Sequence, residues 1–169
     1  MLKKLNYHII TLFIFGSFIK KYRGTWASLF TTLLLFLIFH ILEIEKTLVL
    51  IIILFVSFYS IFAIKTSLKE FSGDDPQEIV IDEFIGQSIP ICLYELFHNE
   101  KINTLEETLQ IYFWFFLLFR IFDGLKPFPI DYIDRKYKNT FGILFDDILA
   151  GVYVTLSSIL FILWKTYLF

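Results

Sequence analysis

The sequence predicts an all-α, polytopic helical bundle in a membrane, with about five transmembrane helices plus an N-terminal interfacial or re-entrant helix. Hydrophobic residues make up 57% of the 169 residues and aromatic residues 20%, which is more apolar surface than a soluble domain of this length can bury. The apolar residues form long runs, and most charged residues lie between those runs. We expect residues 1–169 to form a single integral membrane domain.

Five apolar runs have about the length that a helix needs to cross a bilayer core, roughly 20 residues. They cover residues 24–42, 47–64, 79–97, 108–123 and 145–167. Thr104 precedes the fourth run as an N-cap candidate, with Glu107 three residues later, which is the spacing of a capping box. Pro127 and Pro129 end the helix of that run, and Gly142 is expected in the turn before the fifth run.

The N-terminal stretch MLKKLNYHIITLFIFGSFIKK combines a basic start with an apolar run from Ile9 to Ile19. It has no good small-x-small site for signal peptide cleavage. Because the run is too short to span comfortably, we expect an interfacial or re-entrant helix. The single cysteine, Cys92, excludes a disulfide framework and a thiolate metal site.

Basic residues are distributed unequally between the two sides of the membrane if the five runs alternate in direction. One side receives Lys3, Lys4, Lys20, Lys21, Arg23, Lys65, Lys69, Arg120, Lys126, Arg135, Lys136 and Lys138, and the other receives Lys46, Lys101 and Lys165. The positive-inside rule places the first side in the cytoplasm and the C-terminus outside.

Acidic residues gather on the same expected cytoplasmic side. Asp82 and Glu83 begin the third run, Asp123 ends the fourth, and Asp146 and Asp147 begin the fifth. Carboxylates packed together repel each other unless a cation lies among them. Oxygen ligands suit hard cations, with Mg²⁺ the natural choice when phosphate is also bound.

Basic residues interleaved with these acids, among them Arg120 and Lys126, supply counter-charges for a phosphate. Acids for a metal and bases for a phosphate at a lipid surface suggest phosphoryl chemistry on a lipid headgroup. The expected catalytic face comprises residues 23–28, 79–87, 120–136 and 142–151.

Simpler interpretations apply to several of these residues. Charges at helix ends are often interfacial anchors, and Asp131 with Arg135, or Asp134 with Lys138, has the i,i+4 spacing of a helical ion pair. The acidic doublets are harder to explain in this way, because a helix dipole favours single acids rather than three convergent acidic sites. A glycine lies four residues after Asp82 and another four residues after Asp147, spacing that permits close helix packing.

Three blocks, DEFIGQSIPI, FRIFDGLKPFPIDYIDR and GILFDDILAGV, closely resemble the phosphatidylglycerophosphatase A family in order and spacing. The stretch RGTWASL is similar to an early glycine-threonine-x-x-serine element of that family. The resemblance covers about residues 16–160. It implies a magnesium-dependent enzyme of the bacterial cytoplasmic (inner) membrane that hydrolyses phosphatidylglycerophosphate to phosphatidylglycerol and inorganic phosphate, with its active site facing the cytoplasm.

The resemblance also implies roles for residues that match the family blocks. The implied catalytic residues are Asp82, Glu83, Asp123, Asp146 and Asp147. The implied Mg²⁺ ligands are Asp82, Glu83, Asp123 and Asp147. The implied substrate-binding residues are Thr25, Ser28, Arg120, Lys126, Asp131, Asp134 and Arg135, with Gly24 as a further backbone donor.

Several alternatives stay open at this point. The nucleophile is either a metal-activated water or a carboxylate. Cys92 is followed six places later by His98 rather than arginine, so the cysteine-phosphatase loop is missing. Another lipid phosphate as substrate is the main alternative, and an ion- or proton-coupled transporter is a further one. The expected partners are the substrate and membrane lipids, with no nucleic acid, and the oligomeric state is open.

Overall fold

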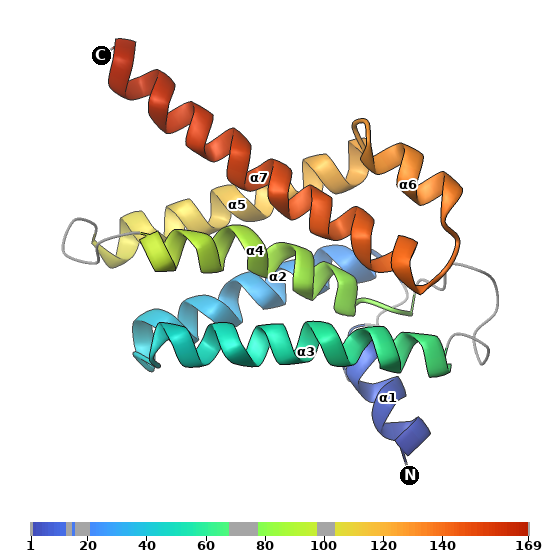
Figure 1. Cartoon of the computed structure of the whole chain (residues 1–169). Helices are drawn as coiled ribbons and strands as arrows, with labels where there is room; N and C mark the ends of the chain where they lie inside the picture. The colour runs from blue at the N-terminus through green and yellow to red at the C-terminus, as the bar shows by residue number, and fades with distance from the viewer. Residues whose placement is uncertain (1, 13–14, 16–20, 68–77, 98–103, 169) are drawn as a thin grey trace.

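The computed structural model describes residues 2–12, 15, 21–67, 78–97 and 104–168, and these residues form a bundle of helices (Figure 1). Within the described residues there is no β-strand, so the prediction of an all-helical chain is confirmed. The elements are α1 (Leu2–Ile10), α2 (Arg23–Phe36), the π-helix η1 (Leu37–Ile41), α3 (Lys46–Ser67), α4 (Ile81–Phe97), α5 (Leu105–Leu125), α6 (Ile130–Lys136) and α7 (Thr140–Leu168).

Four of the five predicted spans form helices that are long and apolar enough to cross a membrane, which makes the chain a helical membrane protein. These spans are Arg23–Ile41, Lys46–Ser67, Leu105–Leu125 and Thr140–Lys165. The third predicted span forms α4, which has 17 residues and is about 25 Å long at 1.5 Å per residue. That length is shorter than a hydrocarbon core of about 30 Å, so the count of five spans stays a prediction.

The ends of α5 agree with the sequence signals. Thr104 Oγ1 accepts a hydrogen bond from the Glu107 backbone N–H at 3.2 Å, and Glu107 Oε2 accepts one from the Thr104 N–H at 2.7 Å. The predicted capping box is therefore confirmed. At the other end, Lys126 adopts a left-handed conformation with φ of 43° directly before Pro127, and the helix ends there.

The prediction that Gly142 supplies a turn before the last helix is wrong. Helix α7 begins earlier than expected, at Thr140, and Gly142 lies within its first turn. The Asn139 side chain starts the helix, because its Oδ1 accepts hydrogen bonds from the backbone N–H groups of Phe141 at 3.0 Å and Gly142 at 3.1 Å. These bonds satisfy helix-terminal donors that otherwise have no intrahelical partner.

Helix α4 is the central element of the bundle and packs against α2, α3, α5 and α7 (Figure 1). Its closest crossing is with α7, at Gly86 and Gly151. A Cβ atom on Gly86 would come closer than 3.0 Å to the backbone of Asp147 on α7, and one on Gly151 would contact the Gly86 carbonyl oxygen. The two glycines therefore allow the backbones of α4 and α7 to touch, as small residues do in membrane helix packing.

The beginning of α4, the end of α5, α6 and the beginning of α7 lie together at the right of Figure 1. We call this side the acidic end of the bundle, because it carries Asp82, Glu83, Asp123, Asp146 and Asp147. Helices α2 to α5 run back and forth between this end and the opposite one. The alternation assumed from the sequence therefore matches the arrangement of these helices.

Helix α1 packs against the end of α3 that lies nearest the acidic end. The buried Asn6 accepts a hydrogen bond from the Tyr59 hydroxyl at 2.7 Å and donates one to Thr66 Oγ1 at 2.9 Å. The Ile10 carbonyl accepts a hydrogen bond from the Val80 N–H at 2.9 Å, just before α4. Residues 13–14 and 16–20 of the expected interfacial segment lie outside the described residues.

The α4–α7 crossing predicts a specific sensitivity to a single methyl group. We expect Gly86→Ala and Gly151→Ala each to lower the free energy of unfolding by about 1–3 kcal/mol, because the added Cβ meets backbone that cannot move aside. At about 2–4 °C per kcal/mol, the Tm in detergent should fall by several degrees.

Gly124→Ala is the matched control for these variants. A Cβ there would meet no atom within 4 Å apart from its chain neighbours and its own helix backbone, and alanine is the better helix former, so the Tm should stay equal or rise slightly. Equal Tm values for all three variants would contradict the close crossing.

Candidate active site

Three carboxylates from two helices meet at the acidic end. Asp82 and Glu83 lie in the first turn of α4, and Asp147 lies on α7, one turn before Gly151. One oxygen from each carboxylate lies within 4.8 Å of the others. The glycine crossing causes this convergence, because it brings the backbone of Asp147 against α4.

The surroundings of these carboxylates fit a bound cation. Asp82 Oδ1 and Glu83 Oε2 are buried and have no hydrogen-bond partner among the described residues. Buried polar atoms without a partner cost free energy, and charged ones cost more, so such atoms usually bind an ion or a water molecule. Because all the donors are carboxylate oxygens, the group suits a hard divalent cation better than a soft one.

Asp123 and Asp146 extend the cluster to all five acids that the sequence predicted. Asp123, in the last turn of α5, is close enough to Glu83, Asp146 and Asp147 to interact with each electrostatically. Asp146 is buried, with 8% of its surface exposed, and its Oδ1 accepts a hydrogen bond from the Asp147 N–H at 3.0 Å. Three helices therefore contribute acids to one small volume.

Arg120 connects this cluster to the beginning of α2. Its Nη2 lies 2.9 Å from Asp123 Oδ2, and its Nη1 donates a hydrogen bond to Ser28 Oγ at 3.2 Å. Ser28 in turn donates to the Gly24 carbonyl at 2.8 Å. The Glu83 carboxylate occupies the space that a side chain at position 24 would need. Glycine at this position therefore lets α2 approach the acids.

Lys126 is the second cation of the site and joins two acids from different elements. Its Nζ lies 2.9 Å from Asp146 Oδ2 and 3.2 Å from Asp134 Oδ2. Burial lowers the pKa of Lys126, but the hydrogen bonds and negative charges of Asp146 and Asp134 outweigh burial, so its pKa lies above the ordinary value. Lys126 is therefore fully charged at neutral pH.

Asp134 also forms an ion pair with Lys138, whose Nζ donates a hydrogen bond to Asp134 Oδ1 at 3.0 Å. Partial burial raises the pKa of Asp134, but Lys138 and Lys126 together hold it below the ordinary value. A small polar cavity of about 20 Å³ lies beside Asp82, Asp134 and Asp146, which is room for about one water molecule or ion. The predicted i,i+4 pair of Asp134 and Lys138 is thus present, but it also belongs to the site.

The remaining predicted substrate-binding residues lie on two different helices, α6 and α2. Asp131 and Arg135 form an ion pair with each other at 2.6 Å on α6, and their side chains are 42% and 77% exposed. This arrangement matches the simpler interpretation of a surface helical pair. Thr25 lies half-buried in the first turn of α2, next to Gly24.

Two features of α4 were not singled out from the sequence. Gln87 is fully buried one turn after Glu83, and neither its Oε1 nor its Nε2 has a hydrogen-bond partner among the described residues. The sequence signal that could have identified Gln87 is a polar residue within an apolar run, one turn after the acidic doublet. The other feature is Glu95, which is 2% exposed near the opposite end of α4.

Glu95 is the centre of a second polar network, far along α4 from the acids. Its Oε1 lies 3.0 Å from His40 Nε2 and accepts a hydrogen bond from the Tyr112 hydroxyl at 2.9 Å. Lys46 Nζ lies 3.4 Å from Oε2 and donates to the Glu95 carbonyl at 2.8 Å. These contacts tie η1, α3 and α5 to α4.

Comparisons with known proteins show which family this chain matches. A profile described as Phosphatidylglycerophosphatase A matches residues 8–162. Phosphatidylglycerophosphatase A of Haemophilus influenzae is 30% identical over 149 residues, which cover 88% of this chain and 84% of that protein.

Two further relatives extend the comparison. A Bacteroides thetaiotaomicron protein with the provisional name phosphatidylinositol-3-phosphatase is 30% identical over 147 residues, covering 82% of this chain and 83% of that protein. Phosphatidylglycerophosphatase A of Escherichia coli is 34% identical over 84 residues, covering 50% of this chain and 43% of that protein. No solved structure matches the chain significantly.

Proposed function

The chain belongs to the phosphatidylglycerophosphatase A family and is a phosphatase, and we propose that it hydrolyses phosphatidylglycerophosphate to phosphatidylglycerol and inorganic phosphate. The observation that carries this proposal is the convergence of Asp82, Glu83 and Asp147 beside two cations, Arg120 and Lys126. Acids that can hold a metal, next to bases that can bind a phosphate, are the requirements of phosphoryl transfer. With a phosphatase assigned, the transporter interpretation is no longer needed.

A different lipid phosphate remains the second candidate substrate. It is favoured by the Bacteroides thetaiotaomicron relative, whose provisional name refers to a phosphoinositide and which covers most of this chain. Both candidate substrates carry a phosphate monoester on a lipid headgroup. The acidic cluster and its cations suit that shared group, so the choice between them depends on the rest of the headgroup.

We propose Mg²⁺ as the cofactor, held by Asp82, Glu83 and Asp147, with Asp123 as a further ligand. The support is the set of carboxylate oxygens within 4.8 Å and the buried, unpartnered oxygens of Asp82 and Glu83. When bound, the ion would supply positive charge to the phosphoryl oxygens and so stabilise the charge that develops during transfer.

The cations of the chain would bind the phosphate itself. Asp123 and Ser28 each engage one nitrogen of Arg120, which orients the planar guanidinium while further N–H groups stay available for phosphate oxygens. Lys126 adds a permanent positive charge and holds Asp146 in place. The nucleophile is either a water molecule or one of the carboxylates, and the proposal holds for both.

The proposal predicts a metal-dependent release of phosphate. Purified protein in detergent should release inorganic phosphate from phosphatidylglycerophosphate when Mg²⁺ is present, and excess chelator should abolish the release. Asp82→Asn, Asp123→Asn and Asp147→Asn should each lower kcat by at least about a hundredfold, because each removes a ligand from a charge that stabilises the transition state.

Glu106→Gln is the control for these variants, since Glu106 is an exposed carboxylate at the start of α5, at the other end of the bundle. Parallel assays with phosphatidylinositol 3-phosphate and phosphatidic acid distinguish the candidate substrates. Full turnover in chelator would exclude the proposed metal, and faster turnover of the phosphoinositide would favour the second candidate.

We expect activity to require the planar shape of the Arg120 guanidinium as well as its charge. Arg120→Lys should lower kcat/KM by about tenfold or more, because an ammonium group cannot reproduce the planar fork that Asp123 and Ser28 orient. Arg135→Lys is the matched comparison and should change kcat/KM less than about twofold, since Arg135 is exposed and pairs with Asp131. If both variants kept the parental kcat/KM, Arg120 would be reassigned to a structural role.

We also propose a topology in which residues 1–169 form one membrane domain of five spans with α1 at the interface. In this topology the acidic end faces the cytoplasm, in the bacterial inner membrane. The unequal distribution of lysine and arginine supports the orientation. Helix α4, although short, would be the fifth span because the surrounding helices cover most of its surface. Its polar side chains would then contact protein rather than lipid.

Cysteine labelling tests this orientation. In a chain with Cys92→Ser, Glu106→Cys reports on the opposite end of the bundle and Lys136→Cys reports on the acidic end, and both positions are exposed. An impermeant thiol reagent added to intact cells should modify the first cysteine and not the second. The reverse labelling pattern would overturn the proposed orientation, while leaving the chemistry of the site untouched.

A further inference from the structure

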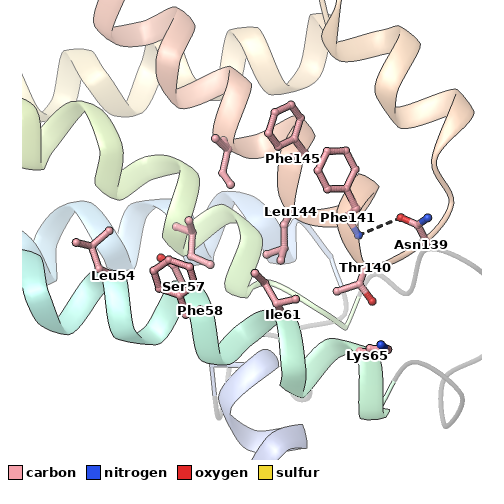
Figure 2. Close-up of a pocket in the computed structure, with 12 residues that line it drawn as sticks. Leu54, Ser57, Phe58, Ile61, Lys65, Asn139, Thr140, Phe141, Leu144 and Phe145 are labelled. Atoms are coloured by element: carbon pink, nitrogen blue, oxygen red, sulfur yellow. Dashed lines mark hydrogen bonds between the residues drawn. The ribbon is translucent and has the colours of Figure 1, made fainter.

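An apolar groove of about 700 Å³ lies between α3 and α7 (Figure 2). Leu54, Phe58 and Ile61 line it from α3, and Leu144, Phe145 and Ile148 line it from α7. Its volume falls within the range of about 300–1,000 Å³ that is usual for ligand pockets. The groove is therefore large enough to hold part of a ligand rather than a single solvent molecule.

The polar lining residues of the groove include Lys65, Asn139 and Thr140, which lie together at one end of it. Figure 2 shows Lys65 on the last turns of α3 close to the level of Thr140 at the start of α7, with the apolar side chains beyond them. This end is the acidic end of the bundle. The groove thus has a cationic and polar mouth and an apolar interior, which is the polarity of a phospholipid.

The length of the groove matches one leaflet of a bilayer. On α3 the lining extends from Leu54 to Lys65, which is 11 positions further along the helix, or about 16 Å at 1.5 Å per residue. One leaflet contributes about half of a hydrocarbon core that is roughly 30 Å thick. A chain that entered at the polar mouth would therefore reach about the depth at which acyl chains end.

The groove lies next to the acidic cluster, because α4 and α7 contribute residues to both. Ile85 lines it and follows Asp82 by three residues on α4. On α7, the groove residues Leu144 and Ile148 flank Asp147. Leu144 packs with Ile85 and the neighbouring Ile143 in one buried apolar cluster.

From these observations, and resting on the proposed function, we propose that the groove between α3 and α7 binds an acyl chain of the phospholipid substrate, with Lys65 pairing with the phosphodiester of the same molecule. The terminal phosphate monoester then extends past the start of α7 to the acidic cluster. Negative charge on the phosphodiester complements Lys65, and each buried methylene contributes to affinity.

A second apolar groove, of about 370 Å³, provides a comparison on the same protein. It is lined by residues of α4, α5 and α7, among them Leu93 and Ile162, in the half of the bundle away from the acids. None of its described lining residues is charged. This second groove therefore has lipid-facing walls without the feature that would select an anionic lipid.

The two grooves allow a matched pair of variants. Ser57 lines the first groove and donates a hydrogen bond to the Ile53 carbonyl at 2.8 Å. Thr155 lines the second and donates to the Gly151 carbonyl at 3.0 Å. Both hydroxyls bond to their own helix four residues back, and both side chains are half-buried. Ser57→Phe and Thr155→Phe therefore fill equivalent positions with the same side chain.

We expect Ser57→Phe to raise KM for long-chain phosphatidylglycerophosphate about tenfold, which is the effect of losing contact with about two methylene groups. KM for a dihexanoyl analogue and kcat for both substrates should stay within about twofold of the parent. Thr155→Phe should leave all these values unchanged. Lys65→Gln should raise KM for both lipids about equally, because both contain the phosphodiester, whereas Lys65→Arg should restore the parental KM.

Photocrosslinking tests binding without relying on turnover. Phosphatidylglycerophosphate with a diazirine in one acyl chain should label α3 and α7 residues of the groove in the parent and in Thr155→Phe, and excess unlabelled substrate should displace it. Ser57→Phe should lose this labelling. Equal labelling of Ser57→Phe and the parent, or labelling that the substrate does not displace, would overturn the proposal and indicate bulk lipid only. Displaceable labelling without phosphate release would retain the groove and refute the proposed function instead.

Discussion

The contact between α4 and α7 at Gly86 and Gly151 is the constraint on which the acidic site depends. Each glycine presents its backbone to the other helix, and a single Cβ at either position would push the helices apart. Asp82 and Glu83 lie one turn before Gly86 on α4, and Asp147 lies one turn before Gly151 on α7. A wider crossing would therefore separate the carboxylates that now lie within 4.8 Å.

The same crossing creates an electrostatic problem that the neighbouring elements reduce. Five acids share a volume into which α5 and the segment after it bring Arg120 and Lys126. These two cations pair with Asp123 and Asp146, whereas atoms of Asp82 and Glu83 have no described hydrogen-bond partner. The protein's own cations thus compensate the charge of Asp123 and Asp146. An external cation would be most stabilised beside Asp82 and Glu83.

Helix α4 can carry so many polar groups because other helices cover it. It has the acidic doublet at its beginning, the buried Gln87 one turn later, and Glu95 near its end. Glu95 is held by His40, Lys46 and Tyr112 from three different elements. Helices α3 and α7 instead expose large apolar side chains along most of their length. The bundle therefore has polar groups along its central helix and apolar side chains on its outside, and the α3–α7 groove lies on that apolar outside, beside the acidic end.

The sequence alone determined the helical class, the approximate positions of the helices and the identity of the acids. Long apolar runs report on helices directly, because the bilayer requires helix length and continuous hydrophobicity. Local signals were equally reliable where they act within one turn, as at the Thr104–Glu107 capping box. They failed at Gly142, because the Asn139 cap that starts α7 earlier competes with a turn that glycine also favours.

Only the tertiary structure decided which of the predicted site residues come together. Asp131 and Asp134 have the same i,i+4 pairing with a basic residue in the sequence, yet Asp131 pairs at the surface and Asp134 also binds Lys126. The difference depends on which face of α6 packs on α7, a contact between segments that no local pattern specifies. Glu95 and the groove beside Lys65 likewise join residues from separate helices. Such features arise from the packing of helices against each other, and periodicity along one helix does not encode them.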